Sequence, residues 1–303
     1  MLRDVTVNSS EPTIEHILFK AVDNLLHNSS YPNSDFKLEG FYREIHKSKN
    51  KTFSVVEAAF NVYDSSCTHA LQNIDILEFR KILSTDQAHD KLYNHNNLLM
   101  LLGLSTNFVV LARLGLKAGK TTWAIGKRPY EIEDKLTYHE KRVYIISHVN
   151  DQVCLKLVIN ADNFSILKSE YHSKQPATDY DSYFWKYRDG NSRCGFYETH
   201  QVYEYREYQG KMYPHNFLRR DYAKCINQKT GVAESEDIGS YQALFSNIVL
   251  HSPPVRFEKM KKSDGMGELN YEYHPEFWEN YNIIKEMPLD ETIERELEAQ
   301  EQD

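Results

Sequence analysis

Three charged residues, Arg43, Glu44 and Glu57, lie inside strongly apolar runs of the stretch LEGFYREIHKSKNKTFSVVEAAFNVYD, residues 38–64. Charges in such surroundings either take part in chemistry or form a structural pair, because burying an uncompensated charge is costly. The lysine-rich middle predicts a three-residue hairpin loop at residues 49–51, since Asn50 tolerates the left-handed conformation that such loops use. The two apolar runs are therefore expected to pair as antiparallel strands.

In the register of this hairpin Arg43 lies opposite Glu57, on the same side as Phe41 and Ile45. We interpret Arg43 and Glu57 as a cross-strand ion pair set in an apolar face, which acts as a register device. A buried pair contributes little net stability, but removing one partner costs about 3–5 kcal/mol. Glu44 receives no role in this scheme.

The apolar residues at the start of the first strand fall on even-numbered positions, whereas those near Arg43 fall on odd-numbered ones. Phe36 and Leu38 are even-numbered, whereas the apolar residues Phe41 and Ile45 are odd-numbered. Gly40 is therefore expected to mark a β-bulge, which would shift the side chains from one face to the other.

Linear catalytic and metal-binding motifs are missing or incomplete. Gly115 to Thr122 has three residues between its glycines, where a phosphate-binding loop needs four, so a basic loop is favoured. His89 and His95 share a polar loop with Asp86 and Asp90, a donor set that fits a metal ion. Loop histidines without a ligand are much commoner, and no HExxH pattern supports the metal. We predict no catalytic, metal or cofactor site.

The serine and cysteine patterns also contain no recognisable catalytic or metal-binding motif. No GxSxG elbow is present, so a serine hydrolase of that type is not supported. The four cysteines, Cys67, Cys154, Cys194 and Cys225, form no CxxC pair. They could form two disulfides, in any of three connectivities, or remain buried free thiols. We favour free thiols.

Charge and aromatic content bear on binding partners. The chain carries a net charge of −8, of which −7 falls in residues 286–303 and about −1 in the rest, so no general nucleic-acid surface is expected. The aromatic and basic segment 203–222 is interrupted by Glu204, Glu207 and Asp221, and cross-strand packing explains its tyrosines better than base stacking. No apolar run of about 18 residues predicts a transmembrane helix.

Periodicity indicates the elements that must position these residues. Apolar residues at helical spacing predict an amphipathic helix over residues 14–26. Period-two segments then predict strands near residues 35–47, 52–64, 72–83, 129–138, 142–149, 152–159, 164–173, 194–207, 211–219 and 221–227. Short links with Asn, Asp or Gly favour an antiparallel meander.

Two further helical segments are expected. Residues 97–115 are apolar nearly all round and are expected to form a short helical lid over the sheet. Its apolar residues are Leu98, Leu99, Leu101, Leu102, Leu104, Phe108, Val109 and Leu111. The tail 286–303 predicts a solvated acidic helix, because its charges dominate a thin apolar stripe.

These elements predict an α+β protein, mainly an antiparallel β meander that forms a curved sheet or half-barrel. The expected helices are the N-terminal amphipathic helix, the apolar lid and the C-terminal acidic helix. Three segments are predicted: a closing strand or linker of a missing upstream domain over residues 1–10, a single β-rich domain over 11–285, and the acidic tail over 286–303.

Several segments together resemble one family. They are LEGFYRE at 38–44, EAAFNVYD at 57–64, VYIISH at 143–148, the hairpin at 159–171, YQGKMYP at 208–214 and HPEFWENYNII at 274–284. In this order they are similar to the C-terminal region of bacterial envelope proteins that contain a carboxypeptidase-regulatory-like domain. The motif residues that carry the resemblance are Gly40, Phe41, Tyr42, Arg43, Glu44, Phe277, Trp278, Tyr281 and Asn282.

The resemblance implies a location in the periplasm or at the outer-membrane periphery, and a chain that lacks the family's signal peptide and upstream β-sandwich. It implies no catalytic residues, and the family name does not make this chain a carboxypeptidase. The element order is similar to the half-barrels of periplasmic lipoprotein carriers, which is an analogy of fold only.

Three functions remain open. The first is a non-enzymatic envelope protein that binds an apolar ligand or a protein partner on its curved sheet, with peripheral outer-membrane association as one form. The second is a purely structural accessory module. The third is a hydrolase or metal-site protein without a linear motif, which would need a polar pocket with clustered His and carboxylate groups.

Overall fold

The computed structural model describes residues 12–26, 35–49, 51–64, 73–83, 129–174, 192–227, 229–252 and 272–281. The expected N-terminal strand, the apolar lid at 97–115 and the acidic tail at 286–303 lie outside these residues. The described part of the chain contains no helix long and apolar enough to cross a membrane.

Helix α1 spans Ile14–Leu26 and confirms the predicted amphipathic helix. Thr13 caps its first turn, because the Thr13 hydroxyl oxygen accepts a hydrogen bond from the His16 amide at 3.2 Å. Ile17, Leu18, Ala21 and Val22 are buried along one stripe and join the main hydrophobic core. The helix therefore covers one face of the sheet.

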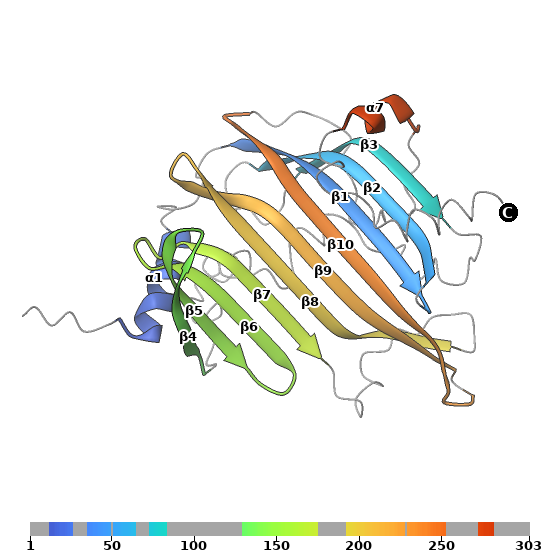
Figure 1. Cartoon of the computed structure of the whole chain (residues 1–303), viewed down its shortest axis with the longest axis horizontal. Helices are drawn as coiled ribbons and strands as arrows, with labels where there is room; N and C mark the ends of the chain where they lie inside the picture. The colour runs from blue at the N-terminus through green and yellow to red at the C-terminus, as the bar shows by residue number, and fades with distance from the viewer. Residues whose placement is uncertain are drawn as a thin grey trace, which may run out of the picture.

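Ten antiparallel strands form one sheet among the described residues. They are β1 (Phe36–Ser48), β2 (Lys51–Asp64), β3 (Asn73–Leu83), β4 (Glu131–Tyr138), β5 (Lys141–Val149), β6 (Val153–Asn160), β7 (Ile166–Lys174), β8 (Ser192–Tyr208), β9 (Lys211–Asn227) and β10 (Ala233–Leu250). The order across the sheet is β3-β2-β1-β10-β9-β8-β7-β6-β5-β4. Strands β3 and β4 are the two edges, so the sheet is open (Figure 1).

Tight turns connect several pairs of neighbouring strands, as the meander prediction requires. Between β8 and β9 the turn residues Gln209 and Gly210 have φ of 49° and 74°. Between β4 and β5, His139 and Glu140 have φ of 47° and 62°. Positive φ at both central residues is the geometry that matches the right-handed twist of the flanking strands.

The strand boundaries correct the sequence prediction in two places. Residues 211–219 and 221–227 were predicted as separate strands, but they form the single strand β9. Strand β10 was not predicted at all. Its core-facing positions include Ser235, Asp237 and Gly239, so the first half of the strand has no apolar alternation for a period-two search to detect.

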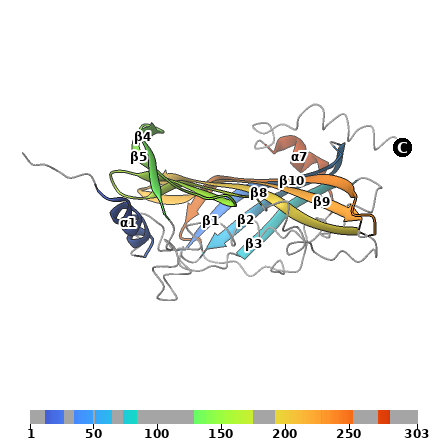
Figure 2. The same ribbon diagram turned by 90° about the horizontal axis from the view of Figure 1, so that it is seen from below.

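Successive side chains of the strands point to two faces of the sheet. We call them the α1 face, covered by α1, and the α7 face, which carries the short helix α7 (Pro275–Asn280). Figure 2 shows the two helices on opposite sides of the sheet. The α1 face holds most of the core, including Phe36, Leu38, Tyr42, Phe60, Phe217 and Tyr241.

Gly40 keeps the parity of β1 constant, contrary to the predicted switch of faces. Phe36, Leu38 and Tyr42 all belong to the core of the α1 face, and Gly40 lies between them on the same side. A Cβ at Gly40 would lie 2.7 Å from Cζ of Phe60, so the phenyl ring occupies the space of the missing side chain. The register does shift between Glu39 and Gly40, but in the pairing with β10.

Candidate functional site

The β1–β2 hairpin places Arg43 opposite Glu57, with Phe41 opposite Ala59 and Ile45 opposite Val55. Arg43 Nε donates to Glu57 Oε1 at 2.6 Å, and the two side chains are 7% and 1% exposed. The loop is one residue shorter than predicted, because Ser48 pairs with Lys51. The register slips between His46 and Lys47 to accommodate the shorter loop.

A second arginine shares the same carboxylate, which sequence reasoning missed. Arg80 of β3 pairs with Glu57 in the β2–β3 ladder and donates to Glu57 Oε2. The Arg80 guanidinium also lies 4.7 Å from the ring centroid of Trp278, a cation–π contact. Two cations thus surround one buried anion, and the cluster keeps one positive charge.

The two motifs behind the family resemblance contact each other on the α7 face. Tyr281 donates its hydroxyl to the carbonyl of Gly40 at 3.2 Å, and its ring lies 6.1 Å from that of Phe41. Phe277 stacks on Tyr281 at 4.9 Å, and Trp278 is buried. Burial raises the pKa of Tyr281 to about 12, so its hydroxyl remains a donor. Asn282 lies outside the described residues.

Glu44, which had no predicted role, belongs to a polar cluster on the α1 face. Its carboxylate accepts a hydrogen bond from the Tyr42 hydroxyl at 2.7 Å and contacts Nε2 of His46. All three side chains are at most 2% exposed. Burial, and then the Glu44 carboxylate, raise the pKa of Tyr42 well above its usual value. The phenol is therefore a fixed donor in this cluster.

The polar cluster continues across β10 onto β9. The Tyr241 ring lies 5.6 Å from that of His46, and the Arg219 guanidinium lies 5.9 Å from the Tyr241 ring centroid. Arg219 Nε in turn lies 2.7 Å from Asp221 Oδ2, and Asp221 is fully buried. These charges compensate each other inside the fold, as buried charges must.

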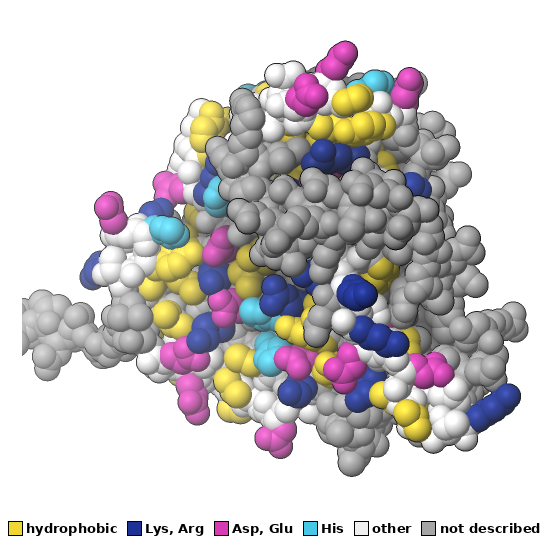
Figure 3. All heavy atoms as spheres, turned by 45° about the vertical axis from the view of Figure 1, so that its right-hand side comes forward, with side chains coloured by type: hydrophobic (Ala, Val, Ile, Leu, Met, Phe, Trp, Pro, Cys, Tyr) yellow, Lys and Arg dark blue, Asp and Glu magenta, His cyan; other side chains and the backbone are white. Residues whose placement is uncertain are grey.

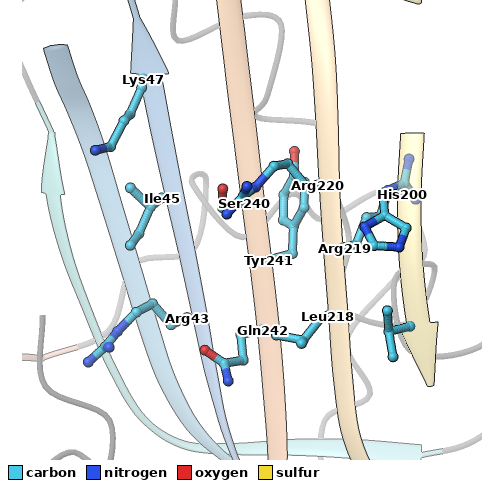
Figure 4. Close-up of a pocket in the computed structure, with 11 residues that line it drawn as sticks. Arg43, Ile45, Lys47, His200, Leu218, Arg219, Arg220, Ser240, Tyr241 and Gln242 are labelled. Carbon is cyan, nitrogen blue, oxygen red and sulfur yellow. The ribbon is translucent and has the colours of Figure 1, made fainter. Parts of the chain in front are cut away.

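A pocket of about 460 Å³ opens on the α7 face, over strands β1, β10, β9 and β8. Its lining residues are Arg43, Ile45, Lys47, His200, Val202, Leu218, Arg219, Arg220, Ser240, Tyr241 and Gln242. Figure 4 shows these side chains on neighbouring strands. The volume falls in the range of small-molecule sites, about 300–1,000 Å³.

The sheet register orders the pocket in rows. Arg43, Gln242, Leu218 and Val202 lie opposite one another on successive strands, and so do Ile45, Ser240, Arg220 and His200. Arg219 and Tyr241 have the opposite parity, so their side chains belong to the α1 face. The pocket therefore combines apolar groups with basic ones.

Basic and acidic side chains are interspersed on the described surface that Figure 3 shows. On strands β4, β6 and β7, for example, Lys156 pairs with Glu133 at 2.8 Å and Lys168 pairs with Glu170 at 2.6 Å. The pocket differs, because the described residues that line it include no Asp or Glu. Its positive charge is local and does not extend over the sheet.

The pKa of His200, at the edge of the pocket, is lowered, which favours the neutral imidazole. Burial lowers its pKa, with contributions of the same sign from His172, Arg220 and Lys168 and an opposing one from Glu170. The rings of His172 and His200 lie 5.9 Å apart. The described residues contain no cluster of three or more His, Cys, Asp or Glu that could hold a metal ion.

The prediction that the cysteines are free thiols is wrong for Cys225. Cys225 is disulfide-bonded, and the β8–β9 ladder pairs it with Cys194. Cys154 is a free thiol whose pKa is raised, mainly by burial. Cys67, like the lid residues Leu98 to Leu111 and the histidine loop at 86–95, lies outside the described residues.

Apart from Arg43, which was predicted as an ion-pair residue, the pocket residues were missed although several lie in predicted strands. Arg219 and Arg220 fall within the segment tested for nucleic-acid binding, and this adjacent pair of cations among apolar residues was the available signal. Ser240 and Gln242 gave none, because β10 was not predicted.

Comparisons with known proteins do not assign this site. No family model matches the chain, and no curated protein sequence matches it. Among solved structures, the chain is similar to a DUF1329 family protein from Desulfovibrio piger, with a TM-score of 0.29 and 8% identity over 81% of this chain and 96% of that one. A structure concerned with lipid–protein interactions in lipovitellin matches with a TM-score of 0.29 and 8% identity. It covers 78% of this chain and 27% of lipovitellin. Neither likeness is strong enough to bear on function.

Proposed function

We propose that this protein is a non-enzymatic binding protein of the cell envelope, which holds an apolar ligand, or the apolar part of one, in the α7-face pocket. The pocket itself carries the proposal. Ile45, Val202 and Leu218 give it an apolar lining on three strands, and Leu218 is 37% exposed. An exposed leucine inside a concave site gains free energy when a ligand covers it, at about 25 cal/mol per Å² of apolar surface.

The polar groups of the pocket favour binding over catalysis. Ser240 and His200 lie in one row of the sheet, but Arg220 of β9 stands between them. Two strand spacings separate their backbones by about 10 Å, too far for a serine–histidine hydrogen bond. A nucleophile activated by a neighbouring base is therefore not assembled from these two residues.

The disulfide at Cys225 supports a location outside the reducing cytoplasm. Disulfides persist in the periplasm and other oxidising compartments, and are rare where thiol-reducing systems operate. This agrees with the envelope location that the sequence resemblance implies.

Native mass spectrometry of the purified protein, before and after extraction with organic solvent, tests the binding role. We expect a bound mass that extraction removes and that added dodecanoate restores. Ser240→Trp should prevent the restoration by filling the pocket. Val149→Trp is the matched control, because Val149 is 62% exposed on β5, remote from the pocket. Equal dodecanoate uptake by the two variants would refute the proposal. So would the absence of uptake by the parent protein, which would favour a structural module.

A further inference from the structure

Four Lys and Arg residues are among the residues that line the α7-face pocket: Arg43, Lys47, Arg219 and Arg220. Some of them have a carboxylate partner and others do not. Arg43 is bound to Glu57, and Arg219 is bound to Asp221 on the opposite face. Lys47 and Arg220 have no ion pair with any carboxylate among the described residues. Two cations of the pocket are therefore uncompensated.

Unpaired basic residues also occur elsewhere among the described residues, as at Lys51 and Lys229, but here two of them line one pocket. The whole sequence has more acidic than basic residues, 44 against 36, so carboxylates are abundant. Other lysines of the sheet find them readily, as Lys37 does with Glu39 at 2.7 Å and Lys141 with Glu207 at 2.5 Å. The described residues that line the pocket include no carboxylate, an arrangement that suits an external anion.

Lys47 and Arg220 lie close enough in the sheet to act on one group, provided that the Lys47 side chain, which points away from Arg220 in Figure 4, turns toward β10. Ile45, Ser240 and Arg220 lie in one row, and Lys47 is two residues further along β1. Their backbones are about 12 Å apart, from two strand spacings across and two residues along, and both side chains are long. Figure 4 shows the Arg220 side chain reaching toward Ser240, whose hydroxyl adds a further donor.

We infer that the pocket selects an amphiphile with an anionic headgroup, a carboxylate or a phosphate, which Lys47 and Arg220 bind beside the apolar lining. The inference rests on the proposed binding function and specifies its ligand class. Arginine binds both oxyanions through paired N–H donors, and lysine acts as a point charge. Leu218 and Val202, in the row beside Arg220, would contact the hydrocarbon chain.

Isothermal titration calorimetry with four probes tests the inference, at concentrations below micelle formation. The probes are dodecanoate, dodecyl phosphate, the neutral dodecanol and inorganic phosphate. We expect both anionic amphiphiles to bind at least tenfold more tightly than dodecanol, and inorganic phosphate to bind weakly. Added salt should weaken the anions and leave dodecanol unchanged, since exposed charges are screened.

Single-charge variants identify the groups responsible. Lys47→Gln and Arg220→Gln should each weaken the anionic amphiphiles roughly tenfold, which corresponds to about 1.4 kcal/mol, and should not change dodecanol binding. Lys229→Gln is the control, because Lys229 is an exposed turn residue without an ion pair to any described residue. Thermal unfolding of each variant checks that the fold is retained.

The outcomes separate this inference from the proposed function. Dodecanol binding as tightly as dodecanoate, or anion binding that survives both Gln substitutions, overturns the anionic selectivity but leaves an apolar-ligand protein. Binding of inorganic phosphate without any amphiphile supports the cationic site and overturns the apolar function. Binding of none of the four probes overturns both.

Discussion

At the scale of single residues, Glu57 compensates two arginines from neighbouring strands. Arg43 and Arg80 both reach its carboxylate, which is 1% exposed, whereas the Arg80 side chain is 26% exposed. Water can therefore solvate Arg80 when its partner is lost, but it reaches Arg43 much less. The cluster is asymmetric, and its members should respond differently to substitution.

Glu57→Ala is expected to destabilise the protein by about 3–5 kcal/mol, because it leaves the buried Arg43 uncompensated and facing Arg80. Urea unfolding measures the change. The double variant Arg43→Met/Glu57→Leu should recover part of the loss, since Arg80 can turn to water. A loss below about 1 kcal/mol in Glu57→Ala would show that the cluster is not buried in solution.

Gly40→Ala should destabilise by about 1–3 kcal/mol through overpacking, because the new Cβ would meet the Phe60 ring. Phe60→Leu in the same chain should restore part of that loss by removing the ring. A double-mutant cycle on thermal unfolding measures the coupling between the two positions. Additive effects would contradict the contact.

The pH dependence of stability should contain a contribution from His215. Burial, and then Arg206, lower its pKa, against smaller opposing effects of the Phe245 backbone and Glu204 and a further lowering by His139. A depressed folded pKa gives stability that is present above the unfolded pKa, about 6.5, and lost as the pH falls through the folded pKa. Urea unfolding between pH 7 and 5 should therefore show a shallower decline for His215→Leu than for the parent protein. Parallel curves for the two proteins would rule out this contribution.

At the scale of the elements, β10 joins the two parts of the meander. It pairs with β1 on one side and β9 on the other, so it connects the β1–β3 strands to the β4–β9 strands. An interior strand forms hydrogen bonds with two neighbouring strands, whereas an edge strand forms them with one. The edge strand β3 also contains Leu77, which falls at a register shift between the pairs of Glu78 and Ile76.

Proline substitutions separate these roles. Ala243→Pro, at a fully buried position of β10, should prevent folding, because proline removes a ladder hydrogen bond in the middle of the sheet. Leu77→Pro should retain the fold with a small loss, since a bulge on an edge strand tolerates proline. Soluble yield and circular dichroism measure both. Similar behaviour of the two variants would contradict the sheet order.

At the scale of the whole molecule, an open sheet, with ten strands among the described residues, divides two kinds of polar site between its faces. The α1 face buries the Tyr42–Glu44–His46 cluster, in which charged and polar groups find partners within the chain. The α7 face holds the pocket, in which Lys47 and Arg220 have no carboxylate partner among the described residues. The first arrangement fits a structural role and the second a binding role.

The disulfide acts on the molecule as a whole. Reduction should lower the free energy of unfolding by about 2–4 kcal/mol, because it releases a constraint on the unfolded chain. Thermal unfolding with and without dithiothreitol measures the effect. Cys154→Ser is the control, since Cys154 is a free thiol and its loss should not change the response to reduction. An unchanged melting temperature under reducing conditions would argue against the Cys225 bridge.

The sequence alone determined the features that depend on neighbours along the chain. Apolar spacing predicted α1, and turn chemistry with period-two alternation predicted the β1–β2 register that sets Arg43 opposite Glu57. These features are local, because one helix turn or one hairpin contains all the residues that decide them.

Only the tertiary structure decided the rest. The pairing of β1 with β10 joins residues about 200 positions apart, and no local signal encodes such a partner. The same long-range pairing places Lys47 of β1 near Arg220 of β9 and places Tyr281 on Gly40. The candidate site is built from four strands at once, so its residues become a site only when the sheet order brings them together.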